Sequence, residues 1–213
     1  MDGPAGAGKS TVARRVAVAT GLPFLDTGAM YRCVALTAVR NGVPTTDSLS
    51  VAEIARNIDI DVRDGITLLD GTDVSSEIRT PEVNSVVSII ATNSAVREVM
   101  REAQRRWARS AGGGVVEGRD IGTVVFPDAT LKVFLTASPE VRAQRRVAEA
   151  GGDVAEVARS IAERDHIDST REDSPLRPAP GAVVVDSSDR PIDEVVSEIV
   201  RLLGESDKGG HDV

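Results

Sequence analysis

Apolar residues recur at helical spacing directly after a glycine-rich opening, at Val12, Ala13, Val16 and Ala17. This spacing predicts a helix with one apolar face, which ends where glycine and proline follow at 21 and 23. Further helices are predicted over about residues 29–41, from Ser50, after Thr80-Pro81, and from Ser94 to the triple glycine at 112–114. Ser50 and Glu53 have the spacing of a capping box, which predicts how the short helix at Ser50 begins.

Residues 58–75 follow a different pattern, in which short apolar runs alternate with tight-turn signals. Asp64-Gly65 and Asp70-Gly71 separate the runs, and Asp-Gly between apolar runs is typical of a two-residue hairpin. The pattern predicts a small antiparallel β insert in an otherwise alternating α/β chain.

Later in the chain, short apolar runs alternate with helical segments. Residues 115–117, 131–135 and 183–186 are predicted to be buried parallel strands. A basic helix is predicted from Ser138-Pro139 to the glycines at 151 and 152, another after Asp153, and an amphipathic one over 192–203. Strand, crossover helix and strand predict a parallel sheet flanked by helices, and the polar residues 206–213 are expected to be disordered.

The composition narrows the class of protein. The 213 residues are 41% hydrophobic, which suits one compact α/β domain with an appended piece or two small domains. Apolar runs stay well short of ~20 residues, and a basic-then-apolar leader is lacking, so we expect neither a membrane span nor secretion. The lone cysteine, Cys33, fits a reducing cytoplasm. The net charge of −8 disfavours nonspecific binding to nucleic acid or to an anionic membrane.

The opening residues match a phosphate-binding loop in full. The match to G-x-x-x-x-G-K-[ST] is Gly3-Pro4-Ala5-Gly6-Ala7-Gly8-Lys9-Ser10, and Thr11 follows it. The glycines let backbone N–H groups surround a β-phosphate, and the helix that starts there directs its positive end at the anion. Lys9 is predicted to bridge the β- and γ-phosphates, and the Ser10 hydroxyl to bind Mg²⁺. We therefore expect ATP to bind with Mg²⁺ at residues 3–11.

Only Met1 and Asp2 precede this loop, which normally follows a buried strand. The strand expected before the loop is absent from the sequence. We expect that the start is truncated and that the sheet has unpaired edges there.

Charged residues follow two of the predicted strands, where open α/β sheets bind ligands. Leu25-Asp26-Thr27-Gly28-Ala29-Met30-Tyr31-Arg32 runs from a strand end into a helix, and Arg32 is either a ligand or a solvated surface charge. Val115-Val116-Glu117-Gly118-Arg119-Asp120 repeats the pattern and predicts a site role for Arg119 and Asp120.

A third group of charges lies in the basic helical region. Arg164, Asp168 and Arg171 are spaced i, i+4 and i+7, so they share one helical face. They belong to a segment with six arginines, at positions 142, 145, 146, 159, 164 and 171. These arginines either form a solvated surface or a basic lid that closes over a triphosphate and excludes water.

With these residues together, the chain closely resembles the bacterial cytidylate kinases, which are nucleoside-monophosphate kinases, over nearly its whole length. The resemblance rests on the runs at 25–32, Val74-Ser75-Ser76-Glu77-Ile78-Arg79-Thr80, Gly118-Arg119-Asp120-Ile121-Gly122-Thr123-Val124-Val125-Phe126-Pro127-Asp128, and Glu163-Arg164-Asp165. It implies a monomeric cytoplasmic enzyme that transfers the γ-phosphoryl group of ATP to CMP or dCMP.

The resemblance also implies roles for individual residues. Ser88, Arg97 and Asp120 would contact the cytosine edge, and Arg164 and Asp168 the sugar. Arg32, Arg119 and Arg171 would hold the acceptor phosphate, with Thr27 near it. Lys9, Arg119, Arg164 and Arg171 would be the catalytic cations. Glu117 stands where some relatives carry aspartate, and its role stays open.

The resemblance further implies a division of the chain. Residues 1–28, 102–137 and 172–205 would form the core with the phosphate loop, 29–101 the monophosphate-binding region with the β insert, and 138–171 the lid.

Two alternatives differ in their sequence requirements. A shikimate-type or dephospho-coenzyme A-type kinase would share the phosphate loop but would not explain the β insert or the set Ser88, Arg97 and Asp120. A GTP-dependent switch would need an Asn-Lys-x-Asp stretch, which this sequence lacks.

Overall fold

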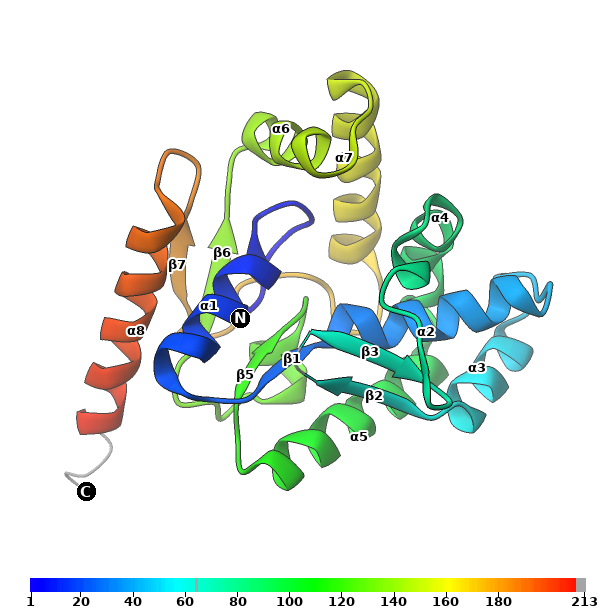
Figure 1. The fold of residues 1–213 in the computed structure, drawn as a ribbon, viewed down its shortest axis with the longest axis horizontal. Coiled ribbons are helices and arrows are strands. Elements are labelled where there is room, and N and C mark those ends of the chain that lie inside the picture. Colours follow the sequence, from blue (N-terminus) through cyan, green and yellow to red (C-terminus); the bar gives the residue numbers. More distant parts are fainter. Residues whose placement is uncertain (64, 210–213) are drawn as a thin grey trace. The chain divides into compact units, whose positions relative to one another are not determined.

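The computed structural model describes residues 1–63 and 65–209, and these form two compact units. Unit 1 joins the two ends of the chain, Met1–Pro23 and Gly114–Val213, and unit 2 is the continuous stretch Phe24–Gly113. The fold is α/β, with parallel strands flanked by helices, as the alternation of apolar runs predicts (Figure 1). The division into core, monophosphate-binding region and lid stays a proposal.

The strands of unit 1 are β5 (Val115–Glu117), β6 (Val133–Thr136) and β7 (Val183–Asp186). Strands β6 and β7 are parallel and in register from Val133 opposite Val183 to Thr136 opposite Asp186. The predicted strands at 115–117 and 183–186 are confirmed, and the strand predicted over 131–135 begins two residues later and ends one residue later.

Met1 and Asp2 lie in the sheet position where the sequence predicts a missing strand. Asp2 forms parallel bridges to both Gly118 and Phe134. The backbone N–H of Asp2 donates to Val133 O, and its carbonyl accepts from Leu135 N, both at 2.8 Å. The carbonyl of Met1 accepts from Gly118 N at 3.0 Å. Two residues therefore supply ladder bonds on both sides, so the prediction that this position lacks a strand partner is wrong.

Helices α1 (Lys9–Thr20) and α8 (Ile192–Gly209) cover this sheet with an apolar cluster. The cluster consists of Val12, Val16, Val133, Leu135, Val185, Val195 and Ile199. Its members come from the predicted apolar stripes and strands, since aliphatic side chains must fill a core in a chain with 2% aromatic residues. Helix α8 continues to Gly209, beyond the end predicted at residue 203 and into the stretch predicted to be disordered from residue 206. Residues 210–213 lie outside the described residues.

Two helices, α6 (Pro139–Ala150) and α7 (Val154–Thr170), pack on each other in unit 1. The predicted caps are confirmed, because the Ser138 side chain accepts from Val141 N and the Asp153 side chain from Ala155 N and Glu156 N. Ala5 of the phosphate loop shares a small apolar cluster with Ala143 of α6 and Ile161 of α7. The loop start is thus packed directly against this helix pair.

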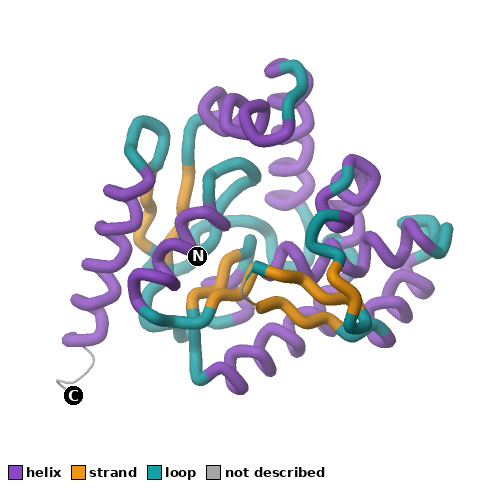
Figure 2. The backbone as a smooth tube through the Cα atoms, in the orientation of Figure 1, coloured by secondary structure: helices purple, strands orange, loops and turns teal. Residues whose placement is uncertain are grey.

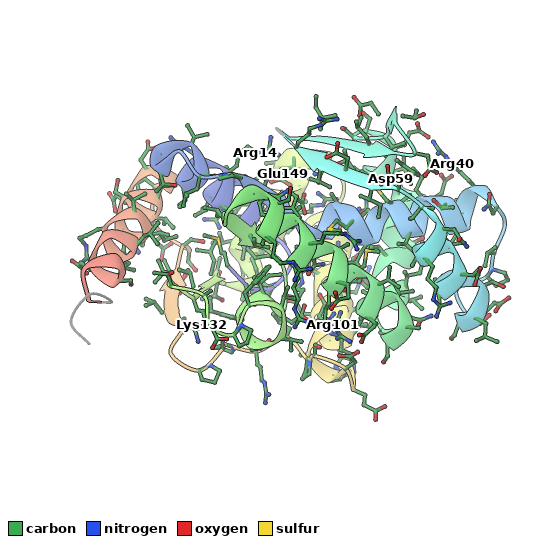
Figure 3. The ribbon with its side chains drawn as sticks, turned by 90° about the horizontal axis from the view of Figure 1, so that it is seen from below. Arg14, Arg40, Asp59, Arg101, Lys132 and Glu149 are labelled. Atoms are coloured by element: carbon green, nitrogen blue, oxygen red, sulfur yellow. The ribbon has the colours of Figure 1, made fainter. Side chains whose placement is uncertain are left out.

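Unit 2 is mainly helical. It contains α2 (Thr27–Arg40), α3 (Ser48–Asn57), a 3₁₀ turn η1 (Glu77–Arg79), α4 (Pro81–Ile90) and α5 (Ser94–Ala111), together with the short strand β1 (Phe24–Asp26). Cys33 is fully buried on α2, and burial raises the pKa of its thiol to about 12, as expected of a packing residue. The surface carries ion pairs such as Arg40 with Glu77 and Arg101 with Glu98, and both arginines are labelled in Figure 3.

The predicted antiparallel insert is present in unit 2 as β2 (Ile60–Arg63), β3 (Ile66–Leu69) and β4 (Thr72–Asp73), drawn in orange in Figure 2. Asp70 and Gly71 both have positive φ, at 50° and 78°, which is what a two-residue hairpin turn requires. The turn predicted at Asp64-Gly65 includes Asp64, which lies outside the described residues.

The start of α3 differs from the predicted capping box. The helix begins at Ser48, and the side chain of Asp47 accepts from Ser50 N at 3.1 Å. Ser50 is therefore inside the helix, because an aspartate three residues earlier already satisfies its N–H. Within the described residues, no helix combines the length and apolarity needed to cross a membrane.

Replacing Gly3 with alanine is expected to destabilise the protein by about 2–4 kcal/mol. An added Cβ would lie 2.0 Å from the carbonyl oxygen of Leu135, in a backbone conformation with φ of 152°. Urea unfolding followed by circular dichroism measures the change. Gly204→Ala is the control, because its Cβ would enter open space on α8 and should raise stability by about 0.5–1 kcal/mol. A Gly3→Ala protein as stable as the parent would contradict the close contact.

Candidate active site

The phosphate loop, residues 3–10, ends in the first turn of α1. Gly8 is the N-cap residue and has φ of 85°, a conformation that glycine adopts without strain. Lys9 is the first helical residue, while Ser10 and Thr11 are exposed at the same helix end. The N-terminal turn of a helix has backbone N–H groups without partners inside the helix, and they attract an anion. The local sequence therefore forms the loop and helix start that its motif predicts.

Lys9 is almost fully buried beside this loop. Its exposed fraction is 6%, and its ammonium donates to the carbonyl of Pro4 at 2.7 Å. Burial, and then the positive charge of Arg119, lower the pKa of Lys9 to about 7. The amine is thus pointed back along the loop in a poorly solvated place, where a phosphate would be its natural counter-ion.

Two charged side chains from α6 and α7 hold the backbone of the loop. Asp165 accepts a hydrogen bond from the N–H of Ala5 at 3.0 Å, and Arg142 donates to the carbonyl of Ala5 at 3.0 Å. Arg142 and Asp165 also form an ion pair with each other. The backbone N–H and the carbonyl of Ala5 are therefore both bound by side chains of α6 and α7. Sequence reasoning counted Arg142 only among the lid arginines and gave Asp165 no role.

A second group of predicted residues is brought together elsewhere in unit 1. Arg119 Nε donates to Asp168 Oδ2 at 2.7 Å, and the Arg171 guanidinium lies 3.7 Å from Asp168 Oδ1 and 3.6 Å from Asp120 Oδ1. We call Lys9, Arg119, Asp120, Arg164, Asp168 and Arg171 the charge cluster. These six residues share one network of ion pairs and electrostatic contacts.

The pKa shifts in the charge cluster have a common cause. Burial alone would lower the pKa of Arg119 and raise that of Asp168, but their ion pair outweighs burial and shifts both in the opposite direction. Arg164 is different, because burial, and then the charge of Arg119, lower its pKa. Further carboxylates outside the cluster share in neutralising these buried cations, since Glu117 acts on Lys9 and Arg119, and Asp165 acts on Arg119 and Arg164.

The helical spacing that predicted one face at Arg164, Asp168 and Arg171 is confirmed with one refinement. Arg164 and Asp168 lie within α7, whereas Arg171 is the residue that ends it. The guanidinium of Arg171 is 2% exposed and its Nε donates to the carbonyl of Ser174 at 2.8 Å. The residue is therefore fixed as the chain leaves the helix.

Arg32 and Thr27 lie at the start of α2 in unit 2. Thr27 is buried as the first helical residue, and the preceding Asp26 caps the helix by accepting from Ala29 N at 3.0 Å. Arg32 donates to the carbonyl of Ile78 at 2.9 Å and to the side chain of Asn84 at 2.6 Å. These contacts orient Arg32, so the interpretation as a solvated surface charge is wrong.

Ser88 on α4 and Arg97 on α5 are buried in unit 2. Arg97 is 1% exposed, donates to the carbonyl of Ala91 at 3.2 Å, and has its guanidinium 5.8 Å from the ring centroid of Tyr31. A buried arginine needs such acceptors and a ring face because desolvating its charge is costly. The contact between Arg97 and Tyr31 is a finding that the sequence analysis did not predict.

The donor groups around the loop fit a metal ion that arrives with a nucleotide. The described part of the chain has no cluster of three or more His, Cys, Asp or Glu side chains suited to a metal ion. Mg²⁺ commonly keeps several waters and binds one or two protein groups together with phosphate oxygens. The exposed hydroxyl of Ser10 fits that requirement, and the buried carboxylate of Glu117 lies within electrostatic reach of Lys9.

Comparisons with known proteins show the family of this chain. The sequence profile of the cytidylate kinase family matches residues 1–205. The cytidylate kinase of Pelotomaculum thermopropionicum is 49% identical, covering 94% of this chain and 92% of the relative. That of Desulforamulus reducens is 50% identical, with 94% and 93% covered, and that of Rhodococcus opacus is 48% identical, with 96% and 93% covered. With a full-length family match and relatives near half identity, this chain belongs to the cytidylate kinase family.

Proposed function

We propose that this chain transfers the γ-phosphoryl group of ATP to CMP or dCMP, giving ADP and CDP or dCDP. The observation that carries the proposal is the electrostatic contact between Lys9 of the phosphate loop and Arg119, which follows β5 and is linked through Asp168 to Arg171 at the end of α7. A triphosphate and an acceptor phosphate are both anions that such cations would bind. Membership of the cytidylate kinase family indicates that the acceptor is CMP or dCMP.

On the donor side, residues 3–11 would bind the phosphates of ATP. Backbone N–H groups of the loop and the N-terminus of α1 would surround the β-phosphate, with Lys9 between the β- and γ-phosphates. Ser10 would hold Mg²⁺, which neutralises developing charge on the phosphate oxygens when bound.

On the acceptor side, Arg32, Arg119 and Arg171 would hold the phosphate of CMP, with Thr27 near it. Arg164 and Asp168 would contact the sugar, and Ser88, Arg97 and Asp120 the cytosine edge. Bidentate guanidinium groups suit phosphate oxygens, and a buried carboxylate suits the exocyclic amine of cytosine.

The chemistry asks little covalent work of the protein. The acceptor phosphate oxygen would attack the γ-phosphorus in line, and Lys9 with Arg119, Arg164 and Arg171 would stabilise the charge on the transferring group. The helix pair α6 and α7 would act as a lid that excludes water, which prevents simple hydrolysis of ATP. We propose that the enzyme works as a cytoplasmic monomer.

A coupled assay of ADP release tests the proposal directly. CMP and dCMP are expected to support turnover, and UMP, AMP, dTMP and shikimate to support much less. A shikimate-type kinase would reverse this order, and a GTP-dependent switch would release no ADP with any of these acceptors.

Replacing Lys9 with alanine is expected to lower turnover by about 10³-fold, because its charge acts on the transferring phosphoryl group. The measurement is kcat with ATP and CMP in a protein whose circular dichroism matches the parent. Lys132→Ala is the matched control, since its exposed ammonium donates to the carbonyl of Pro127 at 2.9 Å and the residue, labelled in Figure 3, is not part of the proposed site. Near-parental turnover in folded Lys9→Ala would remove the central claim.

Binding of a nonhydrolysable ATP analogue at pH 8 is expected to take up close to one proton. The pKa of Lys9 is about 7 before the phosphates bind, so the amine is mostly neutral at pH 8. Phosphate oxygens favour the charged form and raise this pKa, whereas at pH 5.5 the amine is already charged and takes up nothing. Calorimetry in buffers of different ionisation enthalpy measures the uptake, and a Lys9→Met variant should lose it. Equal uptake by both proteins would contradict the assignment.

Replacing Asp120 with alanine is expected to lower kcat/KM for CMP about 5- to 150-fold more than for UMP. An ionised carboxylate can only accept hydrogen bonds, so it favours the amine of cytosine over the carbonyl of uracil. Arg97→Ala is the comparison, since it removes a donor that both bases can use and should weaken both substrates. The measurement is the CMP/UMP ratio of kcat/KM, and an unchanged ratio in Asp120→Ala would mean that Asp120 only orients Arg171.

A further inference from the structure

The carboxylate of Asp2 holds two backbone groups from a distant part of the chain. Oδ1 accepts a hydrogen bond from Ile121 N and Oδ2 accepts one from Gly122 N, each at 2.8 Å. Both bonds are buried, and Asp2 itself is 3% exposed. A carboxylate that receives two backbone donors away from water is fixed in one orientation.

Ile121 and Gly122 open a π-helical turn, Ile121–Val125, which directly follows Arg119 and Asp120. The first N–H groups of a helical turn have no partner within it, so another group must satisfy them. Asp120 occupies the capping position, but its side chain makes no capping bond and instead lies 3.6 Å from Arg171. Asp2 does the capping from elsewhere in the chain, and Asp120 can therefore face the charge cluster.

The backbone of Asp2 is fixed on its other side. It pairs with Val133 and Leu135 of β6, and the next residue, Gly3, begins the phosphate loop. There is no room for even a Cβ between Gly3 and the carbonyl of Leu135. One residue thus links the start of the phosphate loop to the turn that carries Arg119 and Asp120.

We propose that Asp2 is a positioning residue, whose carboxylate fixes Arg119 and Asp120 relative to the phosphate loop. The proposal rests on the proposed function, in which the loop holds the donor and the other two residues hold the acceptor. In-line transfer requires the two reactants to be aligned closely, and misplacement by about 1 Å can cost about 10²-fold in rate. Asp2 aligns the turn with the loop through its two hydrogen bonds, and its charge also acts on Lys9, whose pKa it raises.

Asp2→Asn tests the proposal with little change in size. The variant keeps one acceptor oxygen but directs an NH₂ group at a backbone N–H. We expect kcat with CMP to fall about 10- to 100-fold while KM changes much less, because both substrates bind but are misaligned. The CMP/UMP ratio of kcat/KM should narrow towards that of Asp120→Ala. Ile199→Ala is the matched control, because it destabilises the apolar cluster on α8 and should leave the base ratio unchanged.

A folded Asp2→Asn protein with parental kcat and base ratio would overturn the proposal. An Ile199→Ala protein of the same stability as Asp2→Asn would also overturn it if its kcat and its CMP/UMP ratio of kcat/KM changed as much as those of Asp2→Asn. Amide hydrogen exchange on the parent protein adds a test that needs no variant. The amides of Ile121 and Gly122 should exchange slowly, and exchange as fast as that of exposed amides would overturn the proposal even if Asp2→Asn failed to fold. A parent protein without CMP kinase activity would remove the proposed function, and the exchange data would still test the Asp2 contact.

Discussion

The burial of positive charge at Lys9, Arg119 and Arg164 is the constraint on which the candidate site in unit 1 depends. These cations lie in a poorly solvated place, where like charges repel strongly and each charge has lost part of its hydration. Asp168 offsets the repulsion by pairing with Arg119 and Arg171 at once. Burial is the main cause of the lowered pKa values of Lys9 and Arg164, and the charge of Arg119 adds to it. A bound phosphate group would supply these side chains with a counter-ion.

The phosphate loop is also held by polar contacts. Its backbone is bound by Asp165 of α7, by Arg142 of α6, and by the hydroxyl of Ser187 after β7. Arg145 in turn donates to that hydroxyl at 3.0 Å. Arg142 and Arg145 would repel each other on an exposed surface. Here each guanidinium instead donates to a carbonyl, hydroxyl or carboxylate oxygen. Helices α6 and α7 and the loop are therefore joined by hydrogen bonds.

Local patterns predicted the elements of the fold and the residues whose partners are near in sequence. The loop motif, the shared helical face of Arg164 and Asp168, and the turn at Asp70-Gly71 all follow from spacing and residue type. The cap of α3 was missed because Asp47 and Ser50 are both capping residues, and only the helix start decides between them. Asp2, Asp165 and Asn84 could not be found this way. Their partners are 119, 160 and 52 residues away, and no local period encodes such pairs.

The place of Met1 and Asp2 in the sheet also sets an order of events during synthesis. The amino group of Met1 bonds the carbonyl of Val116, 115 residues later, and Asp2 needs β6 as well. Unit 2 is one continuous stretch, so all of its contacts are available as soon as residue 113 has left the ribosome. The phosphate loop is synthesised before these strands, which follow it by more than a hundred residues. The loop therefore reaches its final structure late, because the long chain segment between loop and strands must close before their hydrogen bonds can form.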